Sequence, residues 1–526
     1  RRQVWHLAYE HHHEQEVLGA IQSVAPHVDH SSPRLQIVTC IDEREESLRR
    51  HIEEQGEEIE TLGAAGFFGV AMNYRGIDDV SAAPYCPVVV KPEHTVTEKA
   101  RTGSEEMDGV RRTRRKLWGT VNLFGSKASR GLVLSPVFIL IGGVAVIALS
   151  IARVLAPGRL VRIQNWFSQT CNPKPPTLLT LLKNESELQY SNKPHMGFTI
   201  SEKIERVGRF LKDSGLANRM APLVVLLGHG STSLNNPHES AHDCGACGGR
   251  RGGANARAFA AMANHPEVRN GLNVSGILVS SDTWFVGGYH DTSTDEVVLY
   301  DESAVPSAQR SLLAKVRAVL EKARAYSAHE RTRRFQTFQN SNSASQALRH
   351  VEDRAASWAE PRPEYGHCTN AVAIVGRRSR TRGLFLDRRA FLVSYDPTLD
   401  RDASQLTRIL GAVGPVCAGI NLEYYFSSVD NERYGCGTKL PHNVTGLLGV
   451  INGHAGDLRT GLPWQMVELH EPVRLLMVVE SDPRNFAKVM ETNAEVRQLV
   501  QNRWIRLALL DPFGNDILIY DRGEFR

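Results

Sequence analysis

The sequence predicts an α/β protein with a mostly parallel sheet flanked by helices, and two short apolar segments carry that prediction. Residues 35–39 (LQIVT) and residues 223–227 (LVVLL) are continuous runs of mainly aliphatic side chains. Runs of this length and composition are typical of strands that are buried on both faces of a parallel sheet. With 526 residues, the chain is long enough for a large core and for two or three domains.

Composition restricts the function classes. The chain is 41% hydrophobic and 23% charged, and its formal net charge of +4 gives no case for nucleic-acid binding. Its eight cysteines are unevenly scattered, which predicts reduced thiols in a cytosolic protein rather than a disulfide framework. The first residue is Arg1 rather than Met, which indicates a fragment, and no signal peptide is visible at this N-terminus.

The first half of the chain alternates helical and extended patterns. Residues 1–30 have apolar positions at helical spacing, and residues 198–214 predict a helix that leads into the second strand. Residues 43–60 predict a charged helix that faces solvent. The Gly-rich segment 61–69 lacks the Lys and the spacing of a phosphate-binding loop. We therefore expect close backbone packing there, next to the candidate metal-binding residues that follow the first strand.

The next part of the chain continues the strand–loop–helix pattern. Residues 272–280 predict a third strand and residues 297–300 a fourth, and we expect a turn between them at the Gly-Gly-Tyr-His sequence. Residues 304–326 and 332–359 then predict two long polar helices.

A second α/β unit is predicted within residues 361–482. Its strand candidates are short apolar runs bounded by polar loops, and we find no cluster of metal ligands in those loops. The predicted strands are residues 371–375, 390–394 and 475–480.

Both strands of the first unit end in residues that bind metal ions. The first is followed by the sequence CIDER, with Cys40 and Asp42, and the second by GHGS, with His229. The loop after it contains Cys244 and Cys247. Because the carboxyl ends of parallel strands lie at one edge of a sheet, these side chains can converge there. Thiolate, imidazole and carboxylate donors predict a zinc site, although the two loop cysteines also have the Cys-x-x-Cys spacing of a redox motif.

Arg44 gives the Cys40-x-Asp42-x-Arg44 motif two states. Alternation along an extended segment would put the three side chains on the same side. Arg44 can then bind the Asp42 carboxylate through two parallel hydrogen bonds and so compete with the metal for it. With Asp42 on zinc the site is closed by four protein ligands; with Asp42 on Arg44 one position opens for water, as a catalytic zinc requires. We therefore predict catalytic roles for Asp42 and Arg44.

The Cys40-x-Asp42-x-Arg44 motif resembles the first metal motif of β-carbonic anhydrases. In that family a His-x-x-Cys pair supplies the other ligands, whereas here 14 residues separate His229 from Cys244. With this departure, the segments CIDERE, ETLGAAGFFGV, GHGSTSLNNPHESAHDCGACGGRRGG and YGCGTKLPHNVTGLLGV resemble the large DabA subunit of the DAB inorganic-carbon accumulation complex. Members of that family are typically longer, so the resemblance implies that an N-terminal region is missing here.

The resemblance has several implications. It implies a zinc ion held by Cys40, Asp42, His229 and Cys244, with Cys247 as a neighbour in a supporting role. It also implies a β-carbonic-anhydrase-like core and hydration of carbon dioxide to bicarbonate in the assembled complex. The implied partner is DabB, an integral membrane subunit similar to cation-translocating antiporter subunits. The implied location is peripheral, on the cytoplasmic side of the bacterial inner membrane.

One apolar segment raises the question of a membrane helix. Residues 131–152 carry no charge over 22 positions. The alternative is a buried or partner-facing helix pair broken near Pro136 or Gly142-Gly143, and the resemblance favours docking on a membrane partner. We divide the chain into a zinc-binding core formed by residues 1–95 and 196–330, a basic and apolar insertion at 96–195 for membrane or partner docking, and a second α/β unit at 331–526.

Three function classes remain open on the sequence. The first is zinc-dependent hydration of carbon dioxide, coupled to the membrane partner. The second is a structural zinc scaffold, in which Asp42 never leaves the metal. The third is a redox protein that uses Cys244 and Cys247. We expect the first.

Overall fold

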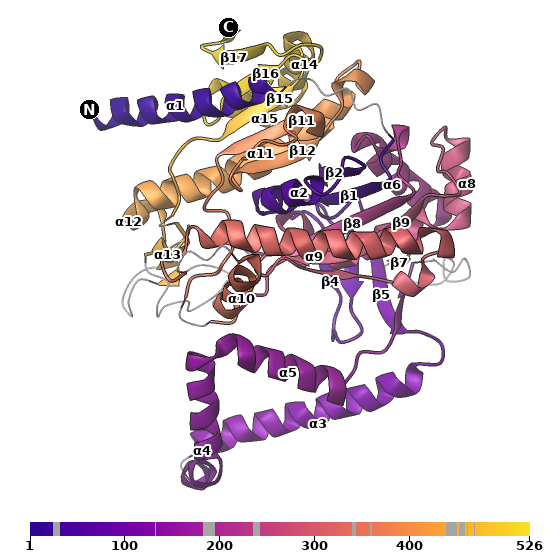
Figure 1. Ribbon diagram of the computed structural model, residues 1–526, viewed down its shortest axis with the longest axis vertical. Coiled ribbons are helices and arrows are strands. Elements are labelled where there is room, and N and C mark those ends of the chain that lie inside the picture. The colour runs from indigo at the N-terminus through magenta and orange to yellow at the C-terminus, as the bar shows by residue number, and fades with distance from the viewer. Residues whose placement is uncertain are drawn as a thin grey trace.

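Strands and helices alternate along the chain in the computed structural model, which describes residues 1–526 except 25–31, 132, 182–194, 235–241, 339–342, 358–359, 438–449, 452–457, 460 and 468. The body contains three sheets of five or six strands each with helices around them, and the helices α3 (Glu105–Arg130), α4 (Leu134–Leu155) and α5 (Pro157–Cys171) project from it as an arm (Figure 1). The predicted α/β class, with mostly parallel sheets and flanking helices, is confirmed. The β-carbonic-anhydrase-like identity of the core stays a prediction.

The first sheet contains the two strands predicted at residues 35–39 and 223–227. In spatial order its members are β10 (Glu296–Leu299), β9 (Trp284–Asp291), β8 (Leu223–Gly230), β1 (Leu35–Cys40) and β2 (Ile59–Ala64). β1 pairs in parallel with β2 and β8, and β8 pairs in parallel with β9, whereas β10 is antiparallel. Every residue of β1 and β8 is buried, as predicted for strands covered on both faces.

Helices cover both faces of the first sheet. They are α2 (Glu46–Glu53), α6 (Ile200–Asp213), α7 (Gly253–Ala263), α8 (Pro266–Val274) and α9 (Arg310–Thr332). Neighbouring residues of β1 point to opposite faces, so Ile37 packs with α2 and α9, whereas Val38 packs with α6, α7 and α8. The helix predicted at residues 198–214 is confirmed as α6, which begins with a capping box of Thr199 and Glu202.

The second sheet contains the three strands predicted in the second unit. In spatial order its strands are β12 (Ala390–Ser394), β11 (Val372–Gly376), β15 (Leu476–Glu480), β16 (Arg506–Leu510), β17 (Ile517–Asp521) and β18 (Glu524–Phe525). The first four run parallel to one another. The other described elements of this part are α10 (Ala344–Ala355), α11 (Ser404–Val429), α12 (Asn431–Tyr434), β13 (Val450–Ile451), β14 (Leu458–Arg459), α13 (Trp464–Val467), α14 (Pro483–Thr492) and α15 (Ala494–Gln501).

The N-terminal helix lies on the second sheet, although it precedes β1 in the chain. Leu18 and Ile21 of α1 (Arg2–Ser23) belong to the buried cluster on one face of that sheet. Glu10 of the same helix forms an ion pair of 2.5 Å with Arg474. The opposite face of the sheet packs against α11, α14 and α15. The division of the chain at residues 95, 195 and 330 stays a prediction.

Two of the sequence predictions are wrong around β9. Residues 272–280 contain the end of α8 rather than a strand, and the strand is β9, where we expected a turn. Gly287 and Gly288 stand in this strand because a side chain would collide with its neighbours: a Cβ on Gly287 would lie 2.6 Å from the backbone of Arg257 on α7. The glycines therefore mark a close helix–sheet contact and not a turn.

The charged segment 43–60 is also different from its prediction. It forms a short 3-10 helix (Glu43–Glu45), then α2, and then enters β2, and most of its charged side chains are buried rather than exposed. Several of their partners come from distant parts of the chain; Glu53, for example, binds Arg378. Burial of a charge is tolerated when it is paired in this way.

A third, mixed sheet carries the arm. Its strands are β4 (Ala83–Tyr85), β3 (Met72–Arg75), β5 (His94–Ala100) and β6 (Thr177–Thr180), with β7 (His195–Met196) beside β5. β5 and β6 are antiparallel neighbours, and the chain between them forms α3 (Glu105–Arg130), α4 (Leu134–Leu155) and α5 (Pro157–Cys171). Figure 1 shows these three helices as a triangle that extends away from the sheets.

The apolar segment 131–152 forms most of α4. The predicted break near Pro136 or Gly142-Gly143 is wrong, because the helix continues through both; Pro136 falls in the first turn, where no intrahelical donor is lost. The segment is not buried either: Leu140 is 83% exposed and Val144 is 80% exposed. Among the described residues, no single helix has the length and apolar composition to cross a membrane, and one bent pair, Gly142–Leu155 with Pro157–Cys171 at 119°, has them in combination.

Candidate metal centre

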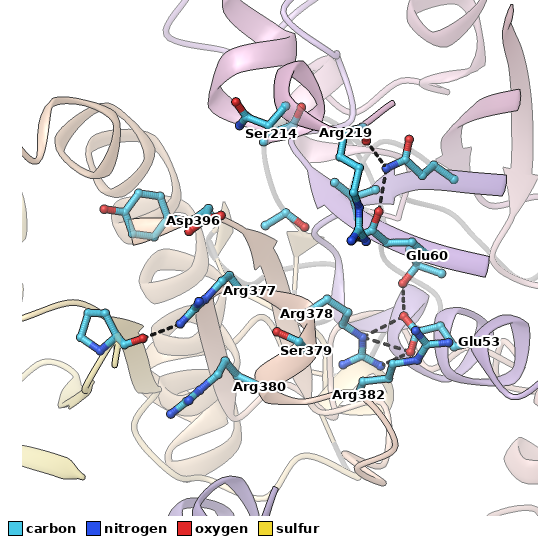
Figure 2. Close-up of a pocket in the computed structure, with 18 of the residues that line it drawn as sticks. Glu53, Glu60, Ser214, Arg219, Arg377, Arg378, Ser379, Arg380, Arg382 and Asp396 are labelled. Carbon is cyan, nitrogen blue, oxygen red and sulfur yellow. Dashed lines mark hydrogen bonds and ion pairs between the residues drawn. The ribbon is translucent and has the colours of Figure 1, made fainter. Parts of the chain in front are cut away.

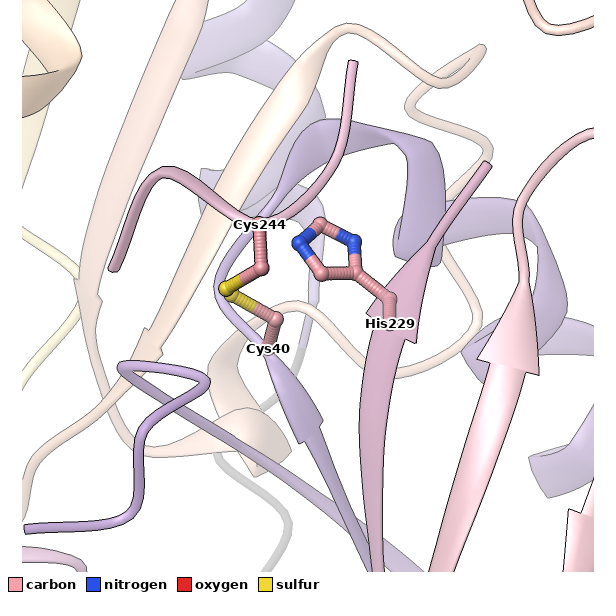
Figure 3. A group of neighbouring side chains, drawn as sticks. All are labelled: Cys40, His229 and Cys244. Carbon is pink, nitrogen blue, oxygen red and sulfur yellow. The ribbon is translucent and has the colours of Figure 1, made fainter. Parts of the chain in front are cut away.

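Three potential metal donors meet at the carboxyl edge of the first sheet. Cys40 is the last residue of β1, His229 lies near the end of the adjacent β8, and Cys244 lies in the loop after β8, directly before a short 3-10 helix (Gly245–Cys247) (Figure 3). One donor atom from each lies within 4.8 Å of the other two, and all three residues are buried. The parallel pairing of β1 with β8 produces this convergence, as the sequence predicted.

The backbone around the donors is fixed by short turns. The backbone amide of Cys244 donates to the carbonyl of Arg250 over 3.2 Å, and the amide of Gly249 donates back to the carbonyl of Cys244 over 3.0 Å. On the other side, a Cβ on Gly66 would lie 2.7 Å from the Cys244 sulfur and 3.1 Å from the Cys40 sulfur. The close backbone packing predicted for residues 61–69 is therefore confirmed at Gly66.

The donor chemistry fits a metal ion. His229 is fully buried, yet neither of its ring nitrogens has a hydrogen-bond partner among the described residues. The adjacent Cys244 thiol and burial together raise the pKa of Cys40 well above its ordinary value. Such thiols ionise only next to a strong positive charge, which a divalent cation supplies. The nearest carboxylate oxygens are 3.6 Å from Nε2 and 3.5 Å from Nδ1, so a buried imidazole without an ordinary hydrogen bond lies beside two buried thiols, and a metal at Nε2 would satisfy it.

Asp42 is bound by Arg44, as the motif predicted. Arg44 donates from Nε to Asp42 Oδ1 over 2.8 Å and from Nη2 to Oδ2 over 2.7 Å, and its Nη1 donates to the carbonyl of His242 over 2.7 Å. Burial by itself would raise the pKa of Asp42, but Arg44 and the nearby imidazoles lower it well below its usual range. Asp42 Oδ2 also lies 3.6 Å from His229 Nε2, so the carboxylate borders the donor group while Arg44 holds it. The four-ligand set that includes Asp42 stays a prediction.

A row of buried groups behind His229 was not predicted. His229 Nδ1 lies 3.5 Å from Glu45 Oε1, and that oxygen is 2.8 Å from Nδ1 of His290. His290 stands beside His229 in the β8–β9 pairing, and its Nε2 lies 3.2 Å from Asp295, which pairs with Arg331. A carboxylate behind a histidine ligand fixes the orientation and tautomer of its ring. Glu45 therefore leaves Nε2 of His229 facing the thiols and Asp42.

This row predicts a specific pH dependence of stability. Burial alone would lower the pKa of His290, but Glu45 and Asp295 raise it to about 9. A group whose folded pKa lies above its unfolded value stabilises the protein below about pH 6.5 and loses that contribution as the pH rises through about 9. We expect the free energy of unfolding to fall by up to roughly 3 kcal/mol between those pH values because of His290.

Chemical denaturation between pH 6 and pH 9.5 checks this expectation. His290→Gln should lower stability at neutral pH and flatten the pH profile, whereas His12→Gln, at an exposed position on α1, should leave the profile unchanged. The same slope in the wild type and in His290→Gln would mean that His290 is uncharged in the folded protein.

A side chain of the second unit also approaches Asp42. His367 Nδ1 lies 2.9 Å from Glu43 Oε1 and 3.8 Å from Asp42 Oδ1, and one donor atom from each of the three lies within 4.8 Å of the others. Glu364 accepts a hydrogen bond of 2.8 Å from Ser231, directly after β8. Glu43 is visible in the CIDER sequence, and Glu364 and His367 are visible in segment 361–367. No sequence pattern, however, predicts that the two segments meet.

Cys247 is buried beside the donor group but is not part of it. Its thiol approaches that of Cys244 closely enough to raise the pKa of the latter. Cys40, Cys244 and Cys247 belong to the same buried cluster as Phe391 and the inner face of the second sheet, so the centre lies at the junction of the two sheets. The loop residues 235–241 lie outside the described part of the chain.

Comparison with known proteins gives a consistent result. The family model of the probable inorganic carbon transporter subunit DabA matches residues 1–505. The chain is 49% identical over its whole length to probable inorganic carbon transporter subunit DabA 2 of Sorangium cellulosum (strain So ce56) and covers 52% of that protein. It is 45% identical over 99% of its length to the DabA protein of Methylococcus capsulatus (strain ATCC 33009 / NCIMB 11132 / Bath), of which it covers 49%. The chain therefore spans about half the length of these relatives, and it belongs to the DabA family.

Proposed function

We propose that this chain is the zinc-binding part of a subunit that hydrates carbon dioxide to bicarbonate within an inorganic-carbon uptake complex. The observation that carries the proposal is the group Cys40, His229 and Cys244 beside an aspartate that Arg44 binds. Two thiols and an imidazole suit zinc, and three protein ligands with a further position are typical of catalytic zinc sites. When bound, zinc supplies the Lewis acidity that makes water a nucleophile near neutral pH.

The residues around the donors suit this reaction. Arg44 keeps Asp42 ionised, so Oδ2 can accept a hydrogen bond from a water molecule beside the donor group and orient it. Ile41 and Phe391 belong to the same buried cluster as the two thiols. They provide an apolar surface for an apolar substrate such as carbon dioxide. Glu45 orients His229. The proposal gives Asp42 and Arg44 the catalytic roles that we predicted from the motif.

Two other functions would use the same residues differently. In a structural zinc scaffold, Asp42 stays on the metal and bicarbonate production does not depend on Arg44. In a redox protein, Cys244 and Cys247 form a disulfide and no stoichiometric zinc is present. Two measurements distinguish these functions: bicarbonate production by the full-length subunit with its partner, and the zinc content of the purified protein. Activity that is lost in site variants with zinc still bound supports the catalytic function over both alternatives.

We also propose that the arm, within the insertion at residues 96–195, docks the chain on a membrane subunit of the DabB type. The word subunit in the relatives' names supports a complex, and the exposed apolar side chains of α4 support an apolar partner surface. The chain would then be peripheral, on the cytoplasmic side of the bacterial inner membrane. The core at residues 1–95 and 196–330 would hold the zinc, and residues 331–526 would complete the site from the second sheet.

Replacing apolar by charged side chains on the arm tests the docking proposal. Leu140→Lys combined with Val144→Lys should leave the chain folded, because both side chains are exposed, and should reduce its copurification with the membrane partner severalfold. Val274→Lys, at a position on α8 that is 91% exposed, is the matched control and should have no effect. Undiminished copurification of the double variant would contradict docking through α4.

A further inference from the structure

A second polar site lies between the two sheets, at a cavity of about 630 Å³. Side chains from both units form its wall, and guanidinium groups are the most frequent of the charged ones (Figure 2). The charged residues that line it are Glu53, Glu60, Arg219, Arg377, Arg378, Arg380, Arg382 and Asp396. A volume of this size is in the range of cavities that hold small organic molecules.

The cavity lies where parallel sheets bind ligands. Its lining includes the last residue of β12 and the segments that follow β11, β12 and β16, namely residues 377–380, 395–396 and 512–513. The chain passes from β11 to β12 on one side and later returns to β15 on the other side of β11, so its progression through the sheet reverses between β11 and β15. In sheets of this kind the crevice at the reversal, beyond the carboxyl ends of the strands, is the usual ligand site.

Glu480, the last residue of β15, interacts with two arginines that follow the adjacent strand β11. It accepts the backbone amide of Arg377 over 2.8 Å and the side-chain Nε over 3.0 Å, and its Oε1 also lies 3.7 Å from Nε of Arg380. Gly376 makes room for it, because a Cβ there would lie 2.8 Å from the Glu480 Cβ. Two guanidinium groups thus share one carboxylate.

Arg380 is the buried part of this group. It is 4% exposed, and its Nη2 donates to the carbonyl of Gly514 over 2.5 Å. Burial lowers its pKa, and the neighbouring Arg377 adds to this effect, whereas Glu480 and Asp511 oppose it. Figure 2 shows Arg377 and Arg380 side by side and pointing the same way, whereas Arg378 points to the other end of the cavity, where it binds Glu53.

We propose that this cavity binds a sugar phosphate, with the phosphate group on Arg377 and Arg380. Guanidinium groups bind phosphate oxygens through charge-assisted hydrogen bonds. Nη2 of Arg377 donates to Glu480 and to the carbonyl of Pro512, and Nη2 of Arg380 donates to the carbonyl of Gly514, so Nη1 of each arginine is the donor left for the phosphate. The remaining wall includes the carboxylate of Glu60 and the amide of Asn218, and such groups accept hydrogen bonds from hydroxyl groups or donate to them. The inference does not rest on the hydration of carbon dioxide.

Isothermal titration of the chain with ribose 5-phosphate, inorganic phosphate and ribose tests the proposal. Ribose 5-phosphate should bind, inorganic phosphate at least about tenfold more weakly, and ribose undetectably. Arg377→Gln and Arg380→Gln should each weaken ribose 5-phosphate at least about tenfold, since a charge-assisted pair is lost. Arg209→Gln, at an exposed position on α6, is the matched control and should bind as the wild type does.

Glu480→Gln gives the sharpest result, because it removes the carboxylate that competes with the ligand. We expect it to bind ribose 5-phosphate severalfold more tightly than the wild type, which loss of structure would not produce. This variant and Arg377→Gln decide the question if Arg380→Gln fails to fold. No binding by the wild type up to about 10 mM, or equal affinities in wild type and variants, would overturn the site. Equal affinities for phosphate and ribose 5-phosphate would overturn the assignment to a sugar phosphate.

Discussion

Replacing Cys244 by alanine is expected to reduce the zinc content from about one ion per chain to a small fraction of that. The thiol is fully buried and lies within 4.8 Å of the donor atoms of Cys40 and His229, so its loss leaves these two donors beside an Asp42 carboxylate that Arg44 holds. Structural and catalytic zinc sites both need at least three protein ligands. Cys40→Ala should have the same effect for the same reason. Metal analysis of the purified variants measures it.

Two other cysteines serve as controls for this result. Cys417 is buried in the second unit, and Cys417→Ala should keep its zinc while losing a similar amount of buried apolar volume. Cys247→Ala should also keep its zinc, since this thiol lies beside the donor group but outside it. Full zinc retention in both Cys40→Ala and Cys244→Ala would show that the ion binds elsewhere. Loss of zinc in Cys247→Ala alone would show that the wrong loop cysteine was chosen.

Arg44→Ala is expected to keep zinc bound and to abolish bicarbonate accumulation by the complex. Without Arg44, the only described guanidinium that binds Asp42 is lost, and a buried carboxylate next to a cation will stay on the cation. The site is then closed. Arg44→Lys should rescue poorly, because an ammonium group cannot make the two parallel hydrogen bonds that Nε and Nη2 make.

The loss of a buried ion pair also lowers stability, by about 3–5 kcal/mol when one partner is removed, so the activity must be compared with a matched control. Arg257→Ala removes another buried arginine, which binds Asp301 and Glu98 away from the donors. It should destabilise the chain similarly while activity survives. Growth of a carbonic-anhydrase-deficient bacterium at ambient carbon dioxide, with the full-length subunit and its partner, measures activity. Near-normal growth with Arg44→Ala would contradict the exchange of Asp42 between Arg44 and the metal.

The sequence predicted the centre of the fold because its signals there are local. The runs at residues 35–39 and 223–227 are apolar on both faces, and such strands pair in parallel, which brings Cys40 and His229 to one edge. The Cys-x-Asp-x-Arg spacing likewise predicted the Asp42–Arg44 pair, because the two residues are close along the chain. The strands of the second sheet were recognisable for the same reason.

The sequence could not predict features that depend on distant partners. The charged residues 43–53 read as a solvent-facing helix, because their counterions, such as His290 and Arg378, come from elements hundreds of residues away. His367 approaches Asp42 from the second unit in the same way. The strand β9 was missed because its two glycines are typical of a turn, whereas they are required here by the packing of α7.

X-ray absorption at the zinc edge, measured on the full-length subunit assembled with its partner, tests the central claim most directly. The account predicts one zinc with two sulfur neighbours at about 2.3 Å and the remaining neighbours nitrogen or oxygen at about 2.0–2.2 Å. Cys40 and Cys244 supply the sulfurs, and His229 supplies a nitrogen. The sulfur signal should fall to one neighbour or vanish with the metal in Cys244→Ala. Three or four sulfur neighbours, or none, would contradict the account.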